Sequence, residues 1–214
     1  MKLNIVFLKA KKDLSTRNIR LLREIIQKHA RKAGGLLGIN LLNITVHPTK
    51  NVIAETGELG HATGSDWIRI GIDPTRKQRA LQRIISDIIP ATIYHEAHHI
   101  SRKKYYGKSS TLFDAVISEG LADVFAKEKW LKFRAPWLNE LKDIKLFLRE
   151  LKKHGNNNKY SHSEWFFGSG RKPKWLGYKL GNYIVHLAKE KTPKLNALKM
   201  AKFPTKTIIK LSGV

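Results

Sequence analysis

Residues 90–104 read Pro-Ala-Thr-Ile-Tyr-His-Glu-Ala-His-His-Ile-Ser-Arg-Lys-Lys, and the interpretation of the whole chain starts from them. Because proline suits the first turn of a helix, we expect a helix from about Pro90 to Lys104. His95 and His99 are four residues apart, so both imidazoles project from one helical face and can bind one zinc ion. Glu96 would lie beside the metal, near the position where water binds, which makes it the candidate general base.

A second helix, expected to be capped by Ser109 or Ser110, carries two carboxylates that extend this pattern. Glu119 follows His99 by 20 residues, enough for a turn and a helix that folds back, and is the predicted third metal ligand. Asp123 lies one helical turn later and is predicted to accept the free N–H of a ligand imidazole, most simply His95. Two alternatives remain: both carboxylates pair with nearby lysines and arginines on a solvated face, and His98 replaces His99 as a ligand.

The motifs resemble those of the glutamate zincins, in which H-E-x-x-H is followed by a ligand glutamate within a Glu-x-x-x-Asp helix. More narrowly, the chain resembles the bacterial family of predicted zinc proteases that carries the DUF2268 domain. The resemblance spans about residues 40 to 190, and its most specific segment is Ser118-Glu119-Gly120-Leu121-Ala122-Asp123. It also includes residues 71–74, 95–99 and 175–181. The resemblance implies a zincin-like fold and zinc-dependent cleavage of peptide bonds.

The predicted mechanism is hydrolysis of a peptide bond by a water molecule that zinc acidifies and Glu96 deprotonates. A second oxyanion donor is expected from Tyr178, because Gly177 and Gly181 flank it and the resemblance includes this segment. His162 is the next choice. The competing interpretation of Tyr178 is core packing with a tethered hydroxyl. His47, His61, His154, His162 and His186 are scattered and are interpreted as surface or satisfied histidines.

The substrate is expected to lie as an extra strand along residues 59–72, where Gly60, Ala62 and Gly64 would permit close approach of its backbone. The alternative is that these residues form an ordinary flexible hairpin connection. Because basic residues are abundant around the motif, acidic or anionic peptides are the favoured substrates.

The rest of the sequence predicts an α+β fold in one domain, 1–214, with a small N-terminal antiparallel sheet followed by helices. The first helix should begin at Ser15 or Thr16 and end at Gly34-Gly35. The other predicted elements are strands near 3–8, 41–47 and 67–72, and helices over 76–88, after Ser110, after Pro136 and over 175–189.

Composition limits the class of protein. The chain has no cysteine, which excludes disulfide scaffolds, cysteine-ligated zinc and thiol catalysis. No apolar run approaches the roughly 20 residues of a membrane span, so the cytoplasm is the expected location. The formal net charge of +24 makes anionic partners plausible, and its densest clusters are 102–104 and 171–174. Solvated surface is the favoured interpretation of these clusters, ahead of nucleic-acid binding.

Two other functions compete with the peptidase. One is a metalloprotease that acts on DNA-associated proteins, which the positive charge would suit, although such proteases tend to use a third histidine. The other is a non-catalytic binding domain, in which zinc joins two helices and the basic surface binds nucleic acid or an acidic protein. Glu96 argues against the second, since a structural zinc site has four protein ligands and no use for a carboxylate beside an open position.

Overall fold

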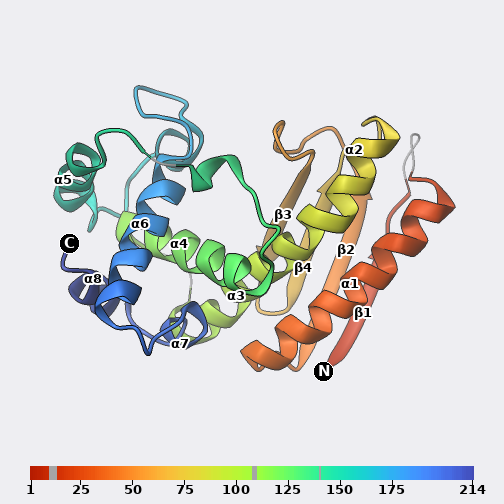
Figure 1. Ribbon diagram of the computed structural model, residues 1–214, viewed down its shortest axis with the longest axis horizontal. Coiled ribbons are helices and arrows are strands. Elements are labelled where there is room, and N and C mark those ends of the chain that lie inside the picture. The colour runs from red at the N-terminus through yellow and green to blue at the C-terminus, as the bar shows by residue number, and fades with distance from the viewer. Residues whose placement is uncertain (10–13, 108–109, 140) are drawn as a thin grey trace. The chain divides into compact units, whose positions relative to one another are not determined.

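The structure is a computed structural model that describes residues 1–9, 14–107, 110–139 and 141–214 (Figure 1). It contains two compact units. The first comprises Met1–Lys104 and Ala126–Arg134, and the second comprises Tyr105–Phe125 and Ala135–Val214. The assignment of 1–214 to one domain stays a prediction. Among the described residues, no helix combines the length and the apolar character that crossing a bilayer requires.

The first unit is built on a four-stranded sheet with the order β1-β2-β4-β3. β1 pairs with β2 and β2 pairs with β4 in parallel, whereas β3 and β4 are antiparallel. The α+β class is confirmed, but the prediction of an antiparallel sheet is wrong for two of the three pairings. The connection interpreted as a glycine-rich loop contains β3, so the chain reverses twice and β4 returns parallel to β2. The strands are β1 Lys2–Phe7, β2 Leu41–Pro48, β3 Glu58–Thr63 and β4 Trp67–Ile72.

One face of this sheet is covered by α1, Thr16–Leu37, and by the helical run that contains the motif (Figure 1). α1 begins as predicted, with the Ser15 hydroxyl accepting a hydrogen bond from the backbone N–H of Asn18 at 3.3 Å. It continues through the predicted end at Gly34-Gly35 and stops at Gly38, whose φ of 66° is left-handed. A Cβ on Gly34 would lie 1.9 Å from the Met1 sulfur, so the missing side chain lets Met1 pack closely against the helix.

The motif helix belongs to a continuous helical run of α2, Gln78–Arg83, the π-helical turn Ile84–Ile88 and α3, Ile89–Tyr106. We predicted two helices, 76–88 and 90–104, and the structure joins them. Pro90 has no N–H, and its ring crowds the carbonyl four residues earlier. A wider π turn immediately before Pro90 lets the run continue without a break.

The second unit contains most of α4, Leu112–Lys129. Its N-terminus is capped by Thr111, whose hydroxyl accepts from the backbone N–H of Asp114 at 3.1 Å. The Asp114 carboxylate accepts in turn from the backbone N–H of Thr111 at 3.2 Å, which forms a reciprocal capping box. The predicted cap at Ser110 is therefore wrong; this residue donates its hydroxyl to Asp114 instead. Ser109 lies outside the described residues.

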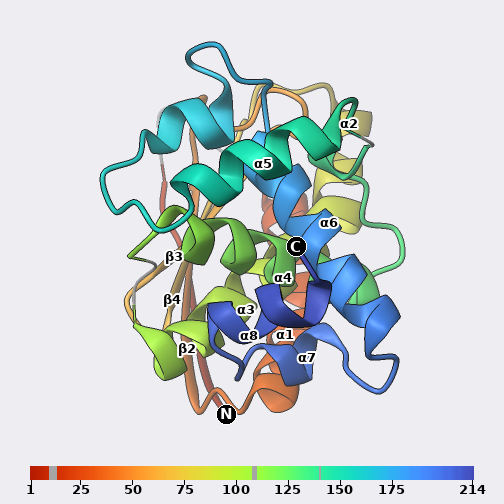
Figure 2. The same ribbon diagram turned by 90° about the vertical axis from the view of Figure 1, so that its left-hand side faces the viewer.

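Helices make up the rest of the second unit, and α6 packs side by side with α8 (Figure 2). The helix predicted over 175–189 is confirmed as α6, whereas only a 3-10 turn follows Pro136 directly. α6 also crosses α4 very closely. A Cβ on Gly120 would lie 2.2 Å from the Gly181 carbonyl carbon, so only glycine fits at this position. The elements are the 3-10 turn Pro136–Leu138, α5 Ile144–His154, the π turn Ser163–Phe167, α6 Leu176–Lys191, α7 Ala197–Met200 and α8 Thr205–Ser212.

Candidate metal centre

The two motif histidines point their outer ring nitrogens at each other from α3. The Nε2 atoms of His95 and His99 are 3.0 Å apart, and their ring planes are inclined by 73°. Tetrahedral zinc with bonds of about 2.0–2.1 Å to nitrogen holds two such atoms roughly 3.3 Å apart, close to the separation seen here. His95 is buried and His99 is half-buried. The spacing of four residues therefore produces the convergence that the sequence predicted.

Glu96 lies against the edge strand β3. Its Oε2 accepts a hydrogen bond from the backbone N–H of Ala62 at 2.7 Å. Gly60 makes this approach possible, because a Cβ there would lie 2.4 Å from the Thr92 methyl carbon and 3.0 Å from Glu96 Oε1. A backbone hydrogen bond thus fixes the candidate base, and the lack of a side chain at Gly60 leaves room for it beside the neighbouring strand.

A second buried carboxyl, Glu58 on β3, lies close enough to Glu96 and His95 for their charges to interact with it. Burial raises the pKa of Glu58 to about 7, although hydrogen bonds from Thr92 and Thr56 oppose the shift. We did not single out this residue from the sequence. A lone glutamate in a glycine-rich connection carries no pattern, and its burial depends on β3 packing against α3.

The raised pKa of Glu58 predicts how stability depends on pH. A carboxyl with a folded pKa of about 7, above its ordinary value of 4.5, contributes stability below pH 4.5 that is lost as the pH rises through 7. Glu58→Gln should therefore raise the free energy of unfolding at pH 8, by at most about 3 kcal/mol, and change it little at pH 4. Urea unfolding at the two pH values measures the difference, and an equal change at both would contradict the assignment.

Glu119, in the second unit, projects from α4 and is half-buried. Its negative charge acts on two neighbours in the loop that follows α5. Burial raises the pKa of Tyr160, and the charges of Asp114 and Glu119 raise it further. Burial lowers the pKa of His162, and Glu119 opposes that shift. Tyr160 is a second residue that sequence reasoning missed, since nothing in a loop rich in asparagine and lysine indicates which side chain approaches the carboxylate.

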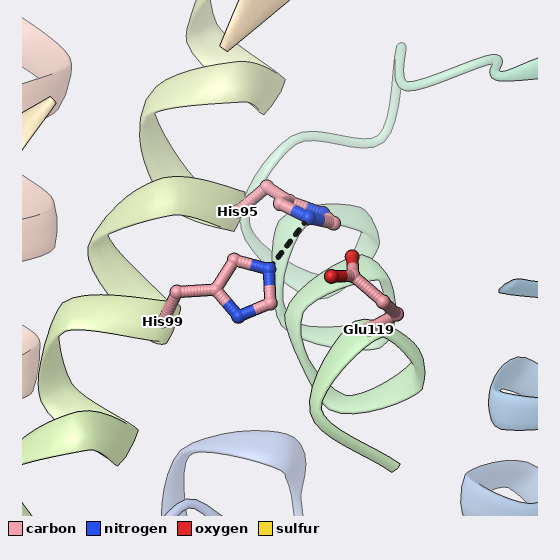
Figure 3. A group of neighbouring side chains, drawn as sticks. All are labelled: His95, His99 and Glu119. Atoms are coloured by element: carbon pink, nitrogen blue, oxygen red, sulfur yellow. Dashed lines mark hydrogen bonds between the residues drawn. The ribbon is translucent and has the colours of Figure 1, made fainter. Parts of the chain in front are cut away.

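Three side chains can together hold a metal ion: His95, His99 and Glu119 (Figure 3). One ligand atom from each lies within 4.8 Å of the ligand atoms of the other two. Two imidazole nitrogens and one carboxylate oxygen are a ligand set that suits zinc and leaves a fourth position for water or substrate. The residues that sequence spacing selected therefore fit the metal.

Asp123 is fully buried one turn beyond Glu119 on α4. Its Oδ2 accepts a hydrogen bond from the Asn182 side-chain amide at 2.7 Å, and the same amide donates to the Tyr178 carbonyl at 2.9 Å. Asn182 thus ties Asp123 to α6, a partner that the sequence did not suggest. The predicted bond from the His95 imidazole to Asp123 stays a prediction.

Tyr178 packs among aromatic rings on α6 and its surroundings. Its ring centroid lies 5.1 Å from that of Trp137, 5.4 Å from Phe166 and 5.7 Å from Trp175. Contacts at these distances stabilise a core, which is the alternative interpretation of this residue. His162 stacks on the same cluster, with its ring 4.4 Å from Phe166. A catalytic role for Tyr178 stays a prediction.

The sheet edge that a substrate strand could pair with contains fewer residues than the predicted range, 59–72. β3 is the edge, whereas β4 lies inside the sheet between β2 and β3. Both backbone groups of Ala62 already have partners on α3: the N–H donates to Glu96, and the carbonyl accepts from the Lys103 ammonium at 2.8 Å. By the alternation of an antiparallel pair, Gly60 presents its N–H and carbonyl at the same edge.

Comparison with known proteins identifies the family. No curated protein and no solved structure matches the chain. A family model described as "Predicted Zn-dependent protease (DUF2268)" matches residues 18–210, which is most of the chain. This confirms the narrower resemblance drawn from the motifs, whereas membership of the glutamate zincins stays a prediction. The chain therefore belongs to the DUF2268 family of predicted zinc-dependent proteases.

Proposed function

We propose that the chain is a zinc-dependent peptidase in which His95, His99 and Glu119 bind the metal and Glu96 is the general base. The observation that carries the proposal is the convergence of the three ligand atoms within 4.8 Å. The fixed position of the Glu96 carboxylate, one residue after His95 on α3, adds to it. A closed structural zinc site would have a fourth protein ligand, and among the described residues the group contains three.

The protein residues have distinct roles in the proposed reaction. Zinc, when bound, supplies Lewis acidity that acidifies water and polarises a carbonyl. The Glu96 carboxylate takes the proton from the attacking water and delivers it to the leaving amine. The hydrogen bond from the Ala62 N–H orients this carboxylate. Asp123, held by Asn182, is proposed to orient a ligand imidazole.

The substrate is proposed to be a peptide in extended form that pairs with the β3 edge beside Gly60. Pairing through backbone groups binds a peptide largely without regard to its sequence. Ala62 can join this pairing only when Glu96 and Lys103 release its backbone groups. The charge of +24 favours acidic peptides.

Tyr178 remains the proposed second oxyanion donor, and its replacement is informative. Tyr178→Phe should lower kcat by about 10²-fold or more with zinc still bound, if its hydroxyl stabilises the oxyanion. Tyr160→Phe is the matched control, since it removes the same hydroxyl from a tyrosine close to Glu119. If turnover falls only in Tyr160→Phe, the role passes to Tyr160; unchanged turnover in Tyr178→Phe removes Tyr178 from the mechanism.

Metal analysis combined with a broad peptide-cleavage assay tests the proposed function. We expect one zinc per chain and cleavage that a chelator abolishes and zinc restores. Bound iron in place of zinc would contradict the assignment of the metal. Stoichiometric zinc without cleavage of any peptide would favour the non-catalytic binding domain, and cleavage stimulated by DNA would favour the DNA-associated protease.

A further inference from the structure

The outer face of α1 is the most one-sided charged surface on a single helix of the first unit. The helix carries six basic residues and one acidic residue, Glu24, and all seven are exposed. None of the six basic side chains forms an ion pair with another described residue. The basic residues are Arg17, Arg20, Arg23, Lys28, Arg31 and Lys32.

Four of these residues form a straight stripe. Arg17, Arg20, Lys28 and Arg31 follow the spacing of three or four residues that keeps side chains on one helical face, and Glu24 occupies the middle of that stripe. The opposite face of α1 carries its buried residues, among them Leu22 and Ile26, and packs on the sheet. At 1.5 Å per residue, the stripe from Arg17 to Arg31 is about 21 Å long.

This arrangement is unfavourable for the helix by itself. Arg17 and Arg20, and again Lys28 and Arg31, are like charges three residues apart, which repel each other. Glu24 offers partial compensation because it lies four residues from both Arg20 and Lys28. A regularly spaced polyanion would compensate the whole stripe.

We propose that the exposed face of α1 binds the phosphodiester backbone of nucleic acid, independently of the candidate metal centre. A row of guanidinium and ammonium groups matches a linear array of phosphates and reads no base sequence. A membrane is a poorer partner, since a helix that lies in a bilayer inserts its apolar face, and that face of α1 is buried on the sheet.

Fluorescence anisotropy with a 20-bp DNA duplex at about 0.15 M salt tests the proposal on the full chain. Each lost phosphate contact reduces affinity about fivefold at this salt, so Arg20→Gln/Arg31→Gln should weaken binding roughly 30-fold. The slope of log affinity against log salt should become shallower by about 1.8. Glu24→Gln should act in the opposite direction and tighten binding, because it removes a negative charge from the middle of the stripe.

The matched control is Lys145→Gln/Lys152→Gln on α5, which removes the same charge from exposed positions of the second unit. It should change affinity far less than the α1 variant. Equal weakening by both double variants would overturn the proposal, because the duplex would then respond only to overall charge. The proposal would also be overturned if the α1 variant weakened binding to phosphatidylserine vesicles or polyglutamate more than it weakened binding to the duplex. Circular dichroism verifies that each variant is folded.

Discussion

Glu96→Gln should lower kcat for peptide cleavage by about 10²- to 10⁴-fold while zinc remains stoichiometric. The amide cannot accept the proton of the attacking water. It nevertheless keeps an oxygen that can accept the hydrogen bond from the Ala62 N–H, so the side chain should stay in place. Zinc content and steady-state cleavage, measured on the same preparation, separate loss of the base from loss of the metal.

Glu58→Gln is the control that the structure offers for this variant. Glu58 is buried on β3 and interacts electrostatically with Glu96, but no step of the proposed reaction uses it. Its replacement should keep kcat within about tenfold of the wild type, because at neutral pH a raised pKa already leaves the carboxyl partly protonated. If Glu96→Gln retains full activity with zinc bound, Glu96 is not the general base; loss of zinc from the variant would show instead that Glu96 helps to hold the metal.

The two histidines of the proposed metal site could be selected from the sequence because their relation follows from the geometry of one helix. A separation of four residues fixes the relation of His95 to His99 regardless of the rest of the fold. Glu119 needed one further assumption, that the next helix folds back, and its role as a ligand stays a prediction, although it belongs with the two histidines to a group that could hold a metal ion. The surroundings of Glu96 were not predictable in this way. The hydrogen bond from Ala62 and the close approach at Gly60 depend on β3, which is distant in sequence.

The errors in the fold have a similar origin. The class and most helices followed from local periodicity. The direction of β4 depended on whether the chain between β2 and β4 reverses once or twice, and β1 is parallel to β2 because α1 forms a crossover connection between them. β3 has only six residues and contains Gly60 and a buried charged residue, Glu58, so it lacks the alternation of a typical strand. Two segments that carry the family resemblance, residues 118–123 and 175–181, each contain a glycine with a structural explanation that sequence could not supply. Gly120 and Gly181 permit the close crossing of α4 and α6.

Glu119→Gln should remove most of the stabilisation that zinc gives to the protein. A ligand that binds only the folded state raises the free energy of unfolding by about 4 kcal/mol when its free concentration is a thousand times its Kd. Replacing the anionic oxygen of Glu119 by a neutral amide should weaken zinc binding by a factor on the order of 100. At the same zinc concentration, about 2.7 kcal/mol of the stabilisation would then be lost.

Thermal or urea unfolding with zinc and with a chelator measures this loss without any need for a substrate. Glu128→Gln is the matched control, because it makes the same substitution nine residues later on α4. The control should keep the zinc-dependent increase in stability, whereas Glu119→Gln and His99→Ala should both lose it. If zinc stabilises Glu119→Gln as much as the wild type, Glu119 is not a ligand. The two histidines alone would then have to hold the metal, which leaves the site two protein ligands fewer than a closed structural zinc site requires.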